Sequence, residues 1–174
     1  MGQDKKILMV IAPEGFRDEE FLEPKKVFEG AGAEVTVASK GVKVAKGKLG
    51  ATADVDMDIS EASADDYDAV VFIGGPGAAV YFDDPVALNL AQKSYNSGKV
   101  TAAICIAPSI LANAGVLDGK QATSFESESR NIEAKSAGYT GKPVTVDGKI
   151  VTANGPAAAK KFGEAIVKLL GDAE

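Results

Sequence analysis

The sequence of 174 residues contains no histidine, and this absence excludes several kinds of catalytic site. A Ser-His-Asp triad, a Cys-His pair and a zinc ion held by histidine all need at least one imidazole, so none of them can form within one chain. We expect the site to contain neither a metal ion nor a cofactor.

The sequence also has only one cysteine, no excess of basic charge and no very long apolar run. The single cysteine, Cys105, cannot form a disulfide within the chain. A formal net charge of −6 without a long basic run argues against nucleic acid or an anionic membrane surface as a partner. No stretch has the length of a membrane span or the flanks of a signal peptide, which favours a cytoplasmic location. The length and the hydrophobic content of 45% predict one domain over residues 1–174.

Apolar runs of strand length alternate with helical patterns along the chain. The runs at 6–12, 34–39, 69–73 and 100–104 are typical of strands buried on both faces of a sheet. Helical patterns cover residues 19–30, the segment from Pro85 to just before Gly98, and residues 157–170. This alternation predicts an α/β fold: a three-layer sandwich with a mostly parallel central sheet. Pro24 lies inside the first helical pattern, so we expect a kink there or a helix that begins there.

Smaller elements are expected in the connecting segments. Asp147-Gly148 suits the tight turn of a β-hairpin. Between residues 42 and 55, lysines, glycines and β-branched residues alternate in short pieces, which suits a small hairpin that lies off the main sheet. We expect a loop at 13–18, the small hairpin at 42–55, a short strand at 121–124, a polar helix at 126–137 and the second hairpin at 144–152.

Cys105 lies between the strand at 100–104 and a helix that Pro108 opens. Ala103 and Ala107 flank it, and such small flanks allow a sharp, strained turn that exposes the central side chain above a sheet. The positive end of the following helix should favour the thiolate. The structural alternative is a buried core cysteine.

Several loops should meet near this sulfur, because ligands of open α/β sheets bind at the carboxyl ends of the strands. The backbone N–H groups of Gly74, Gly75 and Ile106 are candidates to hold a developing oxyanion there. The alternative for the two glycines is a tight turn without a chemical role. The three loops cover residues 13–20, 74–77 and 105–106.

Four acidic residues, Asp18, Glu19, Glu20 and Glu23, gather at the start of the first helical pattern. Such residues ordinarily stabilise the first turn of a helix. One of them can instead point toward Cys105, and a carboxyl beside a thiolate should have a raised pKa and stay protonated. That pair would replace the missing histidine.

Four motifs resemble those of a known family. They are Ala102-Ala103-Ile104-Cys105 followed by Ala107-Pro108, Phe72-Ile73-Gly74-Gly75, the segment from Glu20 to Pro24, and Gly155-Pro156. On these motifs the chain resembles, nearly end to end, the ThiJ/PfpI family, which includes the Parkinson's-disease-associated protein deglycase and PfpI-type intracellular peptidases. The resemblance implies a flavodoxin-like fold, a nucleophile-elbow cysteine at Cys105 and a glutamate, Glu20, that hydrogen-bonds it. It also implies a homo-oligomer, most simply a two-fold dimer.

The sequence departs from that family at two positions where histidine is expected. PfpI-type peptidases carry histidine directly after the cysteine, where this chain has Ile106, and deglycase-type members carry another at the position matched here by Phe125. Neither general base is present. The remaining Glu20–Cys105 dyad with backbone donors suits attack on an aldehyde, or reaction with peroxide, better than amide hydrolysis.

We therefore predict a cysteine-dependent protein that acts slowly on small electrophilic carbonyls, such as glyoxal-type dicarbonyls, in a glyoxalase or deglycase manner. Cys105 and Glu20 are the predicted catalytic residues, and the expected partner is a small electrophile or peroxide. Two alternatives stay open. One is a redox sensor or holdase chaperone whose Cys105 sulfinate is stabilised by Glu20, and the other is a PfpI-type peptidase, against which the lack of histidine weighs.

Overall fold

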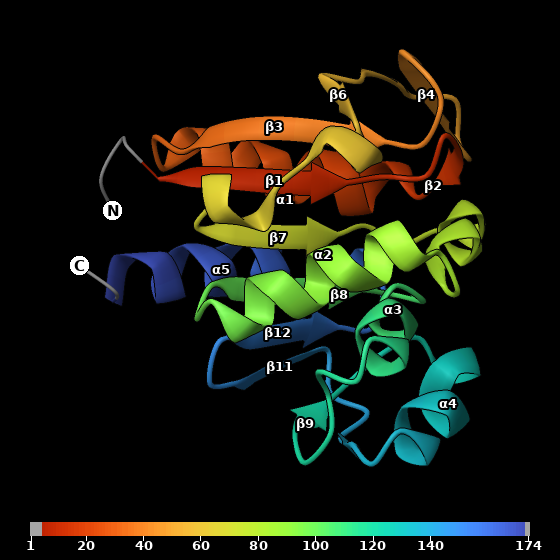
Figure 1. Cartoon of the computed structure of the whole chain (residues 1–174), viewed down its shortest axis with the longest axis vertical. Helices are drawn as coiled ribbons and strands as arrows, with labels where there is room; N and C mark the ends of the chain where they lie inside the picture. The colour runs from red at the N-terminus through yellow and green to blue at the C-terminus, as the bar shows by residue number, and fades with distance from the viewer. Residues whose placement is uncertain (1–4, 173–174) are drawn as a thin grey trace.

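The computed structural model describes residues 5–172, and a seven-stranded sheet lies at its centre (Figure 1). The strand order is β11-β12-β8-β7-β1-β3-β6, and every neighbouring pair is parallel except β11 with β12. This confirms the predicted α/β fold with a mostly parallel central sheet. The strands are β1 (Lys6–Val10), β3 (Glu34–Ser39), β6 (Met57–Asp58), β7 (Ala69–Phe72), β8 (Val100–Ile104), β11 (Val144–Asp147) and β12 (Ile150–Ala153).

Strand β1 shows why helices are needed on both faces of the sheet. Successive side chains of a strand point to opposite faces. Ile7 and Met9 belong to one buried cluster, whereas Leu8 and Val10 belong to the other. A continuous apolar run is therefore buried on both sides.

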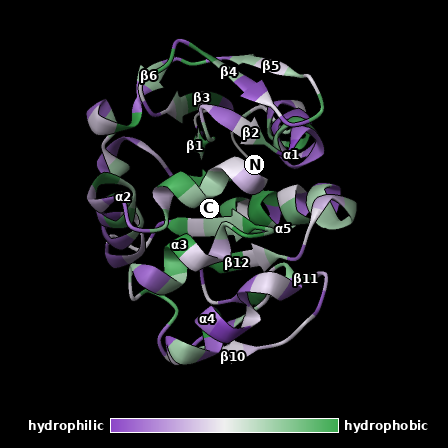
Figure 2. Cartoon of the chain, turned by 90° about the vertical axis from the view of Figure 1, so that its right-hand side faces the viewer, coloured by the Kyte–Doolittle hydropathy of each residue, from purple (hydrophilic) through white to green (hydrophobic). Residues whose placement is uncertain are grey.

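Two pairs of helices cover the two faces (Figures 1 and 2). Helices α1 (Asp18–Gly30) and α5 (Ala159–Asp172) lie on one face, and α2 (Pro85–Asn96) and α3 (Pro108–Asn113) lie on the other. Figure 2 shows the hydrophobic segments gathered between these layers. The hydrophobic faces of the helices are thus turned toward the sheet, as the predicted three-layer sandwich requires.

Helix α1 begins at Asp18 and continues through Pro24, so the expectation of a helix that begins at Pro24 is wrong. Pro24 lies where α1 meets α5, because a Cβ added to Gly163 of α5 would lie only 3.0 Å from the Cα of Pro24. Glycine at 163 therefore allows the two helices to pack closely.

The segment at 42–55 forms the predicted hairpin off the main sheet, from β4 (Val44–Gly47) and β5 (Thr52–Asp54). The loop expected at 13–18 is wrong, because β2 (Glu14–Phe16) is a strand that pairs in parallel with β4. Phe16 is fully buried. A strand of three residues with a central glycine has too few side chains to show a period in the sequence. What makes it a strand is its pairing with the β4–β5 hairpin, which is distant in sequence.

The helix expected at 126–137 is shorter than predicted. A 3-10 turn, η4 (Glu126–Glu128), precedes α4 (Ser129–Ala134), and Ser136 then takes a left-handed backbone with φ of 68° that ends the helix. The predicted short strand at 121–124 is reduced to β9 (Gln121–Ala122), which pairs with β10 (Gly138–Tyr139).

The hairpin predicted at 144–152 is formed by β11 and β12. The other 3-10 turns are η1 (Ile59–Glu61), η2 (Ala64–Asp66), η3 (Pro76–Tyr81) and η5 (Pro156–Ala158). Within residues 5–172, no helix has both the length and the apolar character needed to cross a membrane.

Candidate active site

Cys105 occupies a strained turn between β8 and α3. Its φ of 66° is left-handed, a conformation that only one other non-glycine residue adopts among residues 5–172. Strain of this kind costs of order 1–3 kcal/mol and persists only where the surroundings enforce it. Here the Cys105 N–H donates to the Ala153 carbonyl (2.9 Å), and the Cys105 carbonyl accepts from the Phe125 N–H (2.7 Å). The predicted elbow is confirmed, and Cys105 is half-buried, packed against the core cluster that contains Ile104 and Ala153.

Glu20 is the acidic residue that lies beside Cys105. Its side chain is fully buried, and neither carboxyl oxygen has a hydrogen-bond partner of acceptable geometry. A Cβ added to Gly74 would lie 2.5 Å from the Glu20 Oε1 atom and 2.6 Å from the Cys105 Cβ atom. The carboxyl and the cysteine therefore border the same small space, which stays open because residue 74 is glycine.

The other acidic residues of the cluster have structural partners or face solvent. The Asp18 carboxylate accepts from the N–H groups of Leu49 (2.9 Å) and Ala51 (2.8 Å), which fixes the β4–β5 turn against the start of α1. Glu19 forms a bidentate pair with Arg17, at 2.9 and 3.0 Å. Glu23 is exposed. Only Glu20 is available for chemistry with the thiol.

The three backbone N–H groups predicted as oxyanion donors lie near different side chains, two near the Cys105 sulfur and one near the Glu20 carboxyl. The backbone N–H groups of Gly75 and Ile106 lie toward the Cys105 sulfur, where they favour the thiolate. The N–H of Gly74 lies toward the Glu20 carboxyl, where it favours the carboxylate. The donors near the sulfur are therefore Gly75 and Ile106.

Gly75 is essential for this geometry, and we expect Gly75→Ala to lower the free energy of unfolding by about 2 to 5 kcal/mol. The residue has φ of 102°, and an added Cβ would overlap the Arg17 backbone nitrogen and lie 2.5 Å from the Gly15 carbonyl oxygen. The matched control is Gly98→Ala, where φ is 75° but no atom lies within 4 Å. The control should lose only about 1–2 kcal/mol for its backbone strain. Urea denaturation measures both, and equal losses would contradict the role of close contacts at Gly75.

The pKa values of the pair correct one expectation from the sequence. Burial raises the pKa of Glu20 to about 7. Burial, and next the negative charge of Glu20, raise the pKa of Cys105 to about 12. The expectation of a lowered thiol pKa is therefore wrong. Helix α3 has only six residues, and its dipole does not outweigh the loss of water and the adjacent carboxyl.

The two groups consequently titrate as a pair that retains one proton well above neutral pH. When the pair holds that single proton, a thiolate exists only if the thiol proton has moved to Glu20. The arrangement can therefore pass the thiol proton to Glu20, as a Cys-His pair passes it to histidine.

Replacing Glu20 with glutamine should make the thiol easier to ionise. Glu20→Gln removes the negative charge that raises the Cys105 pKa, so thiolate absorbance near 240 nm should develop at lower pH than in the wild type. Ultraviolet titration between pH 8 and 12 measures this, with the titration of Cys105→Ala subtracted to remove tyrosine absorbance. The matched control is Glu19→Gln, because Glu19 is adjacent in sequence but is paired with Arg17 at the surface. Identical thiol titrations in the wild type and in Glu20→Gln would contradict the coupling.

The same variant changes how stability depends on pH. The Glu20 pKa is about 7 in the folded chain, above the ordinary value of 4.5, so the folded state holds a proton that the unfolded state releases between these pH values. The free energy of unfolding should therefore fall by roughly 3 kcal/mol through this residue as the pH rises from 4.5 to 7. Glu20→Gln should lose that component of the slope, and Glu19→Gln should keep it.

A groove of about 520 Å³ lies next to the backbone of the Cys105 turn, and Cys105 itself is not among the residues that line it. Phe125, whose N–H bonds the Cys105 carbonyl, lines it and is 49% exposed. The groove was not predicted, because its walls come from segments far apart in sequence. Two features singled out in the sequence do line it: Phe125, which matches a histidine position of the resembled family, and the Gly155-Pro156 motif. The lining also includes Glu126, Tyr139, Asn154, Gly155 and Pro156.

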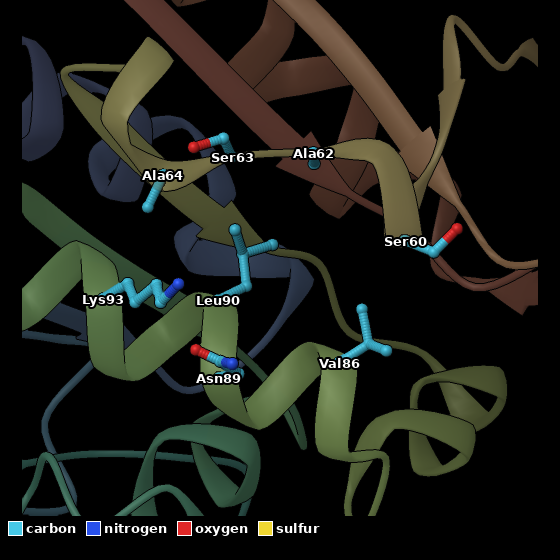
Figure 3. A pocket seen from close by; sticks show the side chains of 8 residues that line it. All are labelled: Ser60, Ala62, Ser63, Ala64, Val86, Asn89, Leu90 and Lys93. Atoms are coloured by element: carbon cyan, nitrogen blue, oxygen red, sulfur yellow. The ribbon is translucent and has the colours of Figure 1, made fainter.

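A second cavity, of about 300 Å³, lies between α2 and the segment that joins η1 to η2 (Figure 3). Ser63, Leu90 and Lys93 are among its lining residues. Neither Cys105 nor the residues that bond its backbone, Phe125 and Ala153, line this cavity, so it is separate from the candidate active site. Within residues 5–172, no cluster of three or more Cys, Asp or Glu side chains is arranged to hold a metal ion.

Comparison with known proteins gives matches over nearly the whole chain. A model of the DJ-1/PfpI family matches residues 5–169. The chain is 40% identical over 171 residues to an uncharacterised protein of Methanocaldococcus jannaschii, covering 97% of this chain and 83% of that protein. It is 32% identical to a deglycase of Thermococcus kodakarensis, covering 94% and 98% respectively. The crystal structure of a ThiJ/PfpI domain protein from Brachyspira murdochii has a TM-score of 0.95 and 37% identity, covering 98% and 99%. The range matched by the family model includes both Glu20 and Cys105.

Proposed function

Because the chain belongs to the DJ-1/PfpI family, as its motifs predicted, we propose that it is a cysteine-dependent enzyme acting on small α-oxoaldehydes in a glyoxalase or deglycase manner. One observation carries the proposal: the fully buried Glu20 carboxyl, whose oxygens have no hydrogen bond of acceptable geometry, borders the strained cysteine. A buried polar group without a partner is costly, so its retention points to a chemical role. A relative that bears the name deglycase supports the reaction class.

The first step is attack by the Cys105 sulfur on the aldehyde carbon. The thiol proton passes to the Glu20 carboxylate, and a sulfur–carbon bond forms as the carbonyl π electrons move to the oxygen. The N–H groups of Gly75 and Ile106, which lie toward the sulfur, stabilise the negative charge on that oxygen.

The later steps convert the adduct into a 2-hydroxy acid. Glu20 first returns the thiol proton to the oxyanion, which gives a neutral hemithioacetal. A proton then leaves the former aldehyde carbon for the Glu20 carboxylate and is delivered to the neighbouring ketone carbon, while the hydroxyl proton moves to the ketone oxygen. The resulting thioester reacts with water, so the sulfur–carbon bond breaks and the thiol is restored. The aldehyde carbon is oxidised and the ketone carbon reduced, and one water is consumed. In the deglycase manner, the same pair acts on a dicarbonyl already joined to an amine, which leaves as the free amine.

The direct test is whether the protein makes lactate from methylglyoxal. Proton NMR should show many lactate molecules formed per protein chain, at a rate absent from buffer and from heat-unfolded protein. Turnover should be slow, because one carboxyl serves in successive proton transfers and general acid–base help is typically worth about 10²–10⁴-fold. Lactate that stops at one molecule per chain would contradict turnover.

A second candidate function is a redox sensor, and the unpartnered carboxyl favours it as well. A protonated Glu20 can donate to an oxygen of a Cys105 sulfinate, which is two oxygens heavier than the thiol. Peroxide treatment followed by peptide mass analysis measures that product. A stable sulfinate without lactate formation would favour the sensor over the enzyme.

The two-fold dimer stays a prediction.

A further inference from the structure

We infer that the groove beside Cys105 selects α-oxoaldehydes with a neutral aromatic substituent, such as phenylglyoxal, over methylglyoxal, and that Phe125 determines this preference. The inference deepens the proposed function and rests on it, because the aldehyde has to meet the sulfur while its substituent lies in the groove.

The position of the groove is fixed by the backbone around the cysteine. Phe125 donates its N–H to the Cys105 carbonyl at 2.7 Å. On the other side, the Cys105 N–H donates to the Ala153 carbonyl at 2.9 Å, and the next two residues, Asn154 and Gly155, line the groove. Both walls are therefore attached directly to the turn that holds the sulfur.

The walls offer apolar and aromatic surface. Phe125 lies on one side and is 49% exposed, although exposed aromatic surface is unfavourable in water. Tyr139 and Pro156 also line the groove, and the Tyr139 hydroxyl donates to the Ser124 carbonyl at 3.2 Å, which fixes the ring. A substrate ring that contacts Phe125 buries apolar surface and adds an aromatic pair, whereas one methyl group covers little of it.

The charge of the groove excludes other substituents. Glu126 is the single ionisable acidic or basic side chain, apart from the phenol of Tyr139, among the residues that line it. No lysine or arginine lines the groove to pair with an anion, so a carboxylate or phosphate substituent meets only repulsion. A neutral ring fits both the charge and the volume of about 520 Å³.

The reaction with phenylglyoxal balances without an external oxidant. Phenylglyoxal and one water give mandelic acid: the aldehyde carbon is oxidised, the ketone carbon is reduced, and the Cys105 thiol is restored.

The test compares kcat/KM for phenylglyoxal and methylglyoxal in the wild type, in Phe125→Ala and in Val86→Ala. Initial rates are used, because arylglyoxals also modify guanidinium groups. The ratio of the two kcat/KM values should favour phenylglyoxal in the wild type and fall about tenfold in Phe125→Ala. Val86→Ala should leave the ratio unchanged. Val86 is a matched control, since it is 41% exposed and lies on α2 at the separate cavity of Figure 3.

A binding measurement separates this inference from the proposed function. The neutral ketones 2-hydroxyacetophenone and hydroxyacetone are titrated into Cys105→Ser, with and without Phe125→Ala, and followed by NMR. The aromatic ketone should bind about tenfold more tightly than hydroxyacetone, and Phe125→Ala should remove that difference. If neither aldehyde is turned over but this binding preference is found, the proposed function fails and the preference of the groove stands. If both aldehydes are turned over at a ratio that Phe125→Ala does not change, the inference is overturned and the proposed function stands.

Discussion

Replacing Cys105 with serine is expected to lower kcat/KM for methylglyoxal by roughly a thousandfold or more. A serine hydroxyl is a weak nucleophile at neutral pH unless a strong base activates it, and the chain has no histidine to do so. A serine hydroxyl is harder to ionise than a thiol in the same surroundings, so the Glu20 carboxylate cannot generate a useful alkoxide. Lactate formation followed by NMR measures the loss.

Cys105→Ala is the matched variant for Cys105→Ser. It removes the nucleophile and, like serine, keeps a small side chain on the left-handed backbone at position 105. Both variants should lose activity equally and should unfold at nearly the wild-type urea concentration, which shows that the loss is chemical. Since Cys105 is the single cysteine, a thiol reagent should label the wild type once and both variants not at all. Activity within tenfold of the wild type in either variant would exclude the sulfur as the nucleophile.

The main sheet was predictable from the sequence because its strands are buried on both faces. Strands β1, β7 and β8 are continuous apolar runs long enough to be distinguished from their surroundings. Strands β2 and β6 have three and two residues, too few to show any period. Their pairing with β4 and β3 depends on parts of the chain that are distant in sequence.

The site was predictable to a similar extent. The small residues around Cys105 predicted the elbow. The acidic cluster at the start of the first helix contained Glu20, the residue that lies beside the cysteine. The direction of the thiol pKa shift was not predictable, because it depends first on how far the fold buries the thiol and next on how closely the Glu20 carboxyl approaches it across Gly74. The groove was missed because its walls combine three stretches, at 124–126, 139–141 and 154–157.

Phe125→His is expected to raise kcat for methylglyoxal by about 10- to 100-fold, which is at or below the lower end of the usual effect of general acid–base catalysis, about 10²–10⁴-fold. The Phe125 N–H already bonds the Cys105 carbonyl, so a side chain at 125 begins next to the reacting turn. That side chain is 49% exposed, so the fold can accept an imidazole there without opening the core. A neutral imidazole can then carry the proton between the two substrate carbons while Glu20 serves the thiol.

The pH profile distinguishes a base from a mere change in groove shape. In Phe125→His, kcat should gain a rise with pH around the ordinary imidazole pKa of about 6.5, because only the neutral form accepts a proton. Phe125→Asn is the matched control, since it is polar and does not titrate, and Val86→His places an imidazole on α2 instead. Neither control should gain activity or the new pH dependence. If Phe125→His and Phe125→Asn have the same kcat from pH 5.5 to 8, proton transfer is not the slow step, and the lack of histidine does not limit this site.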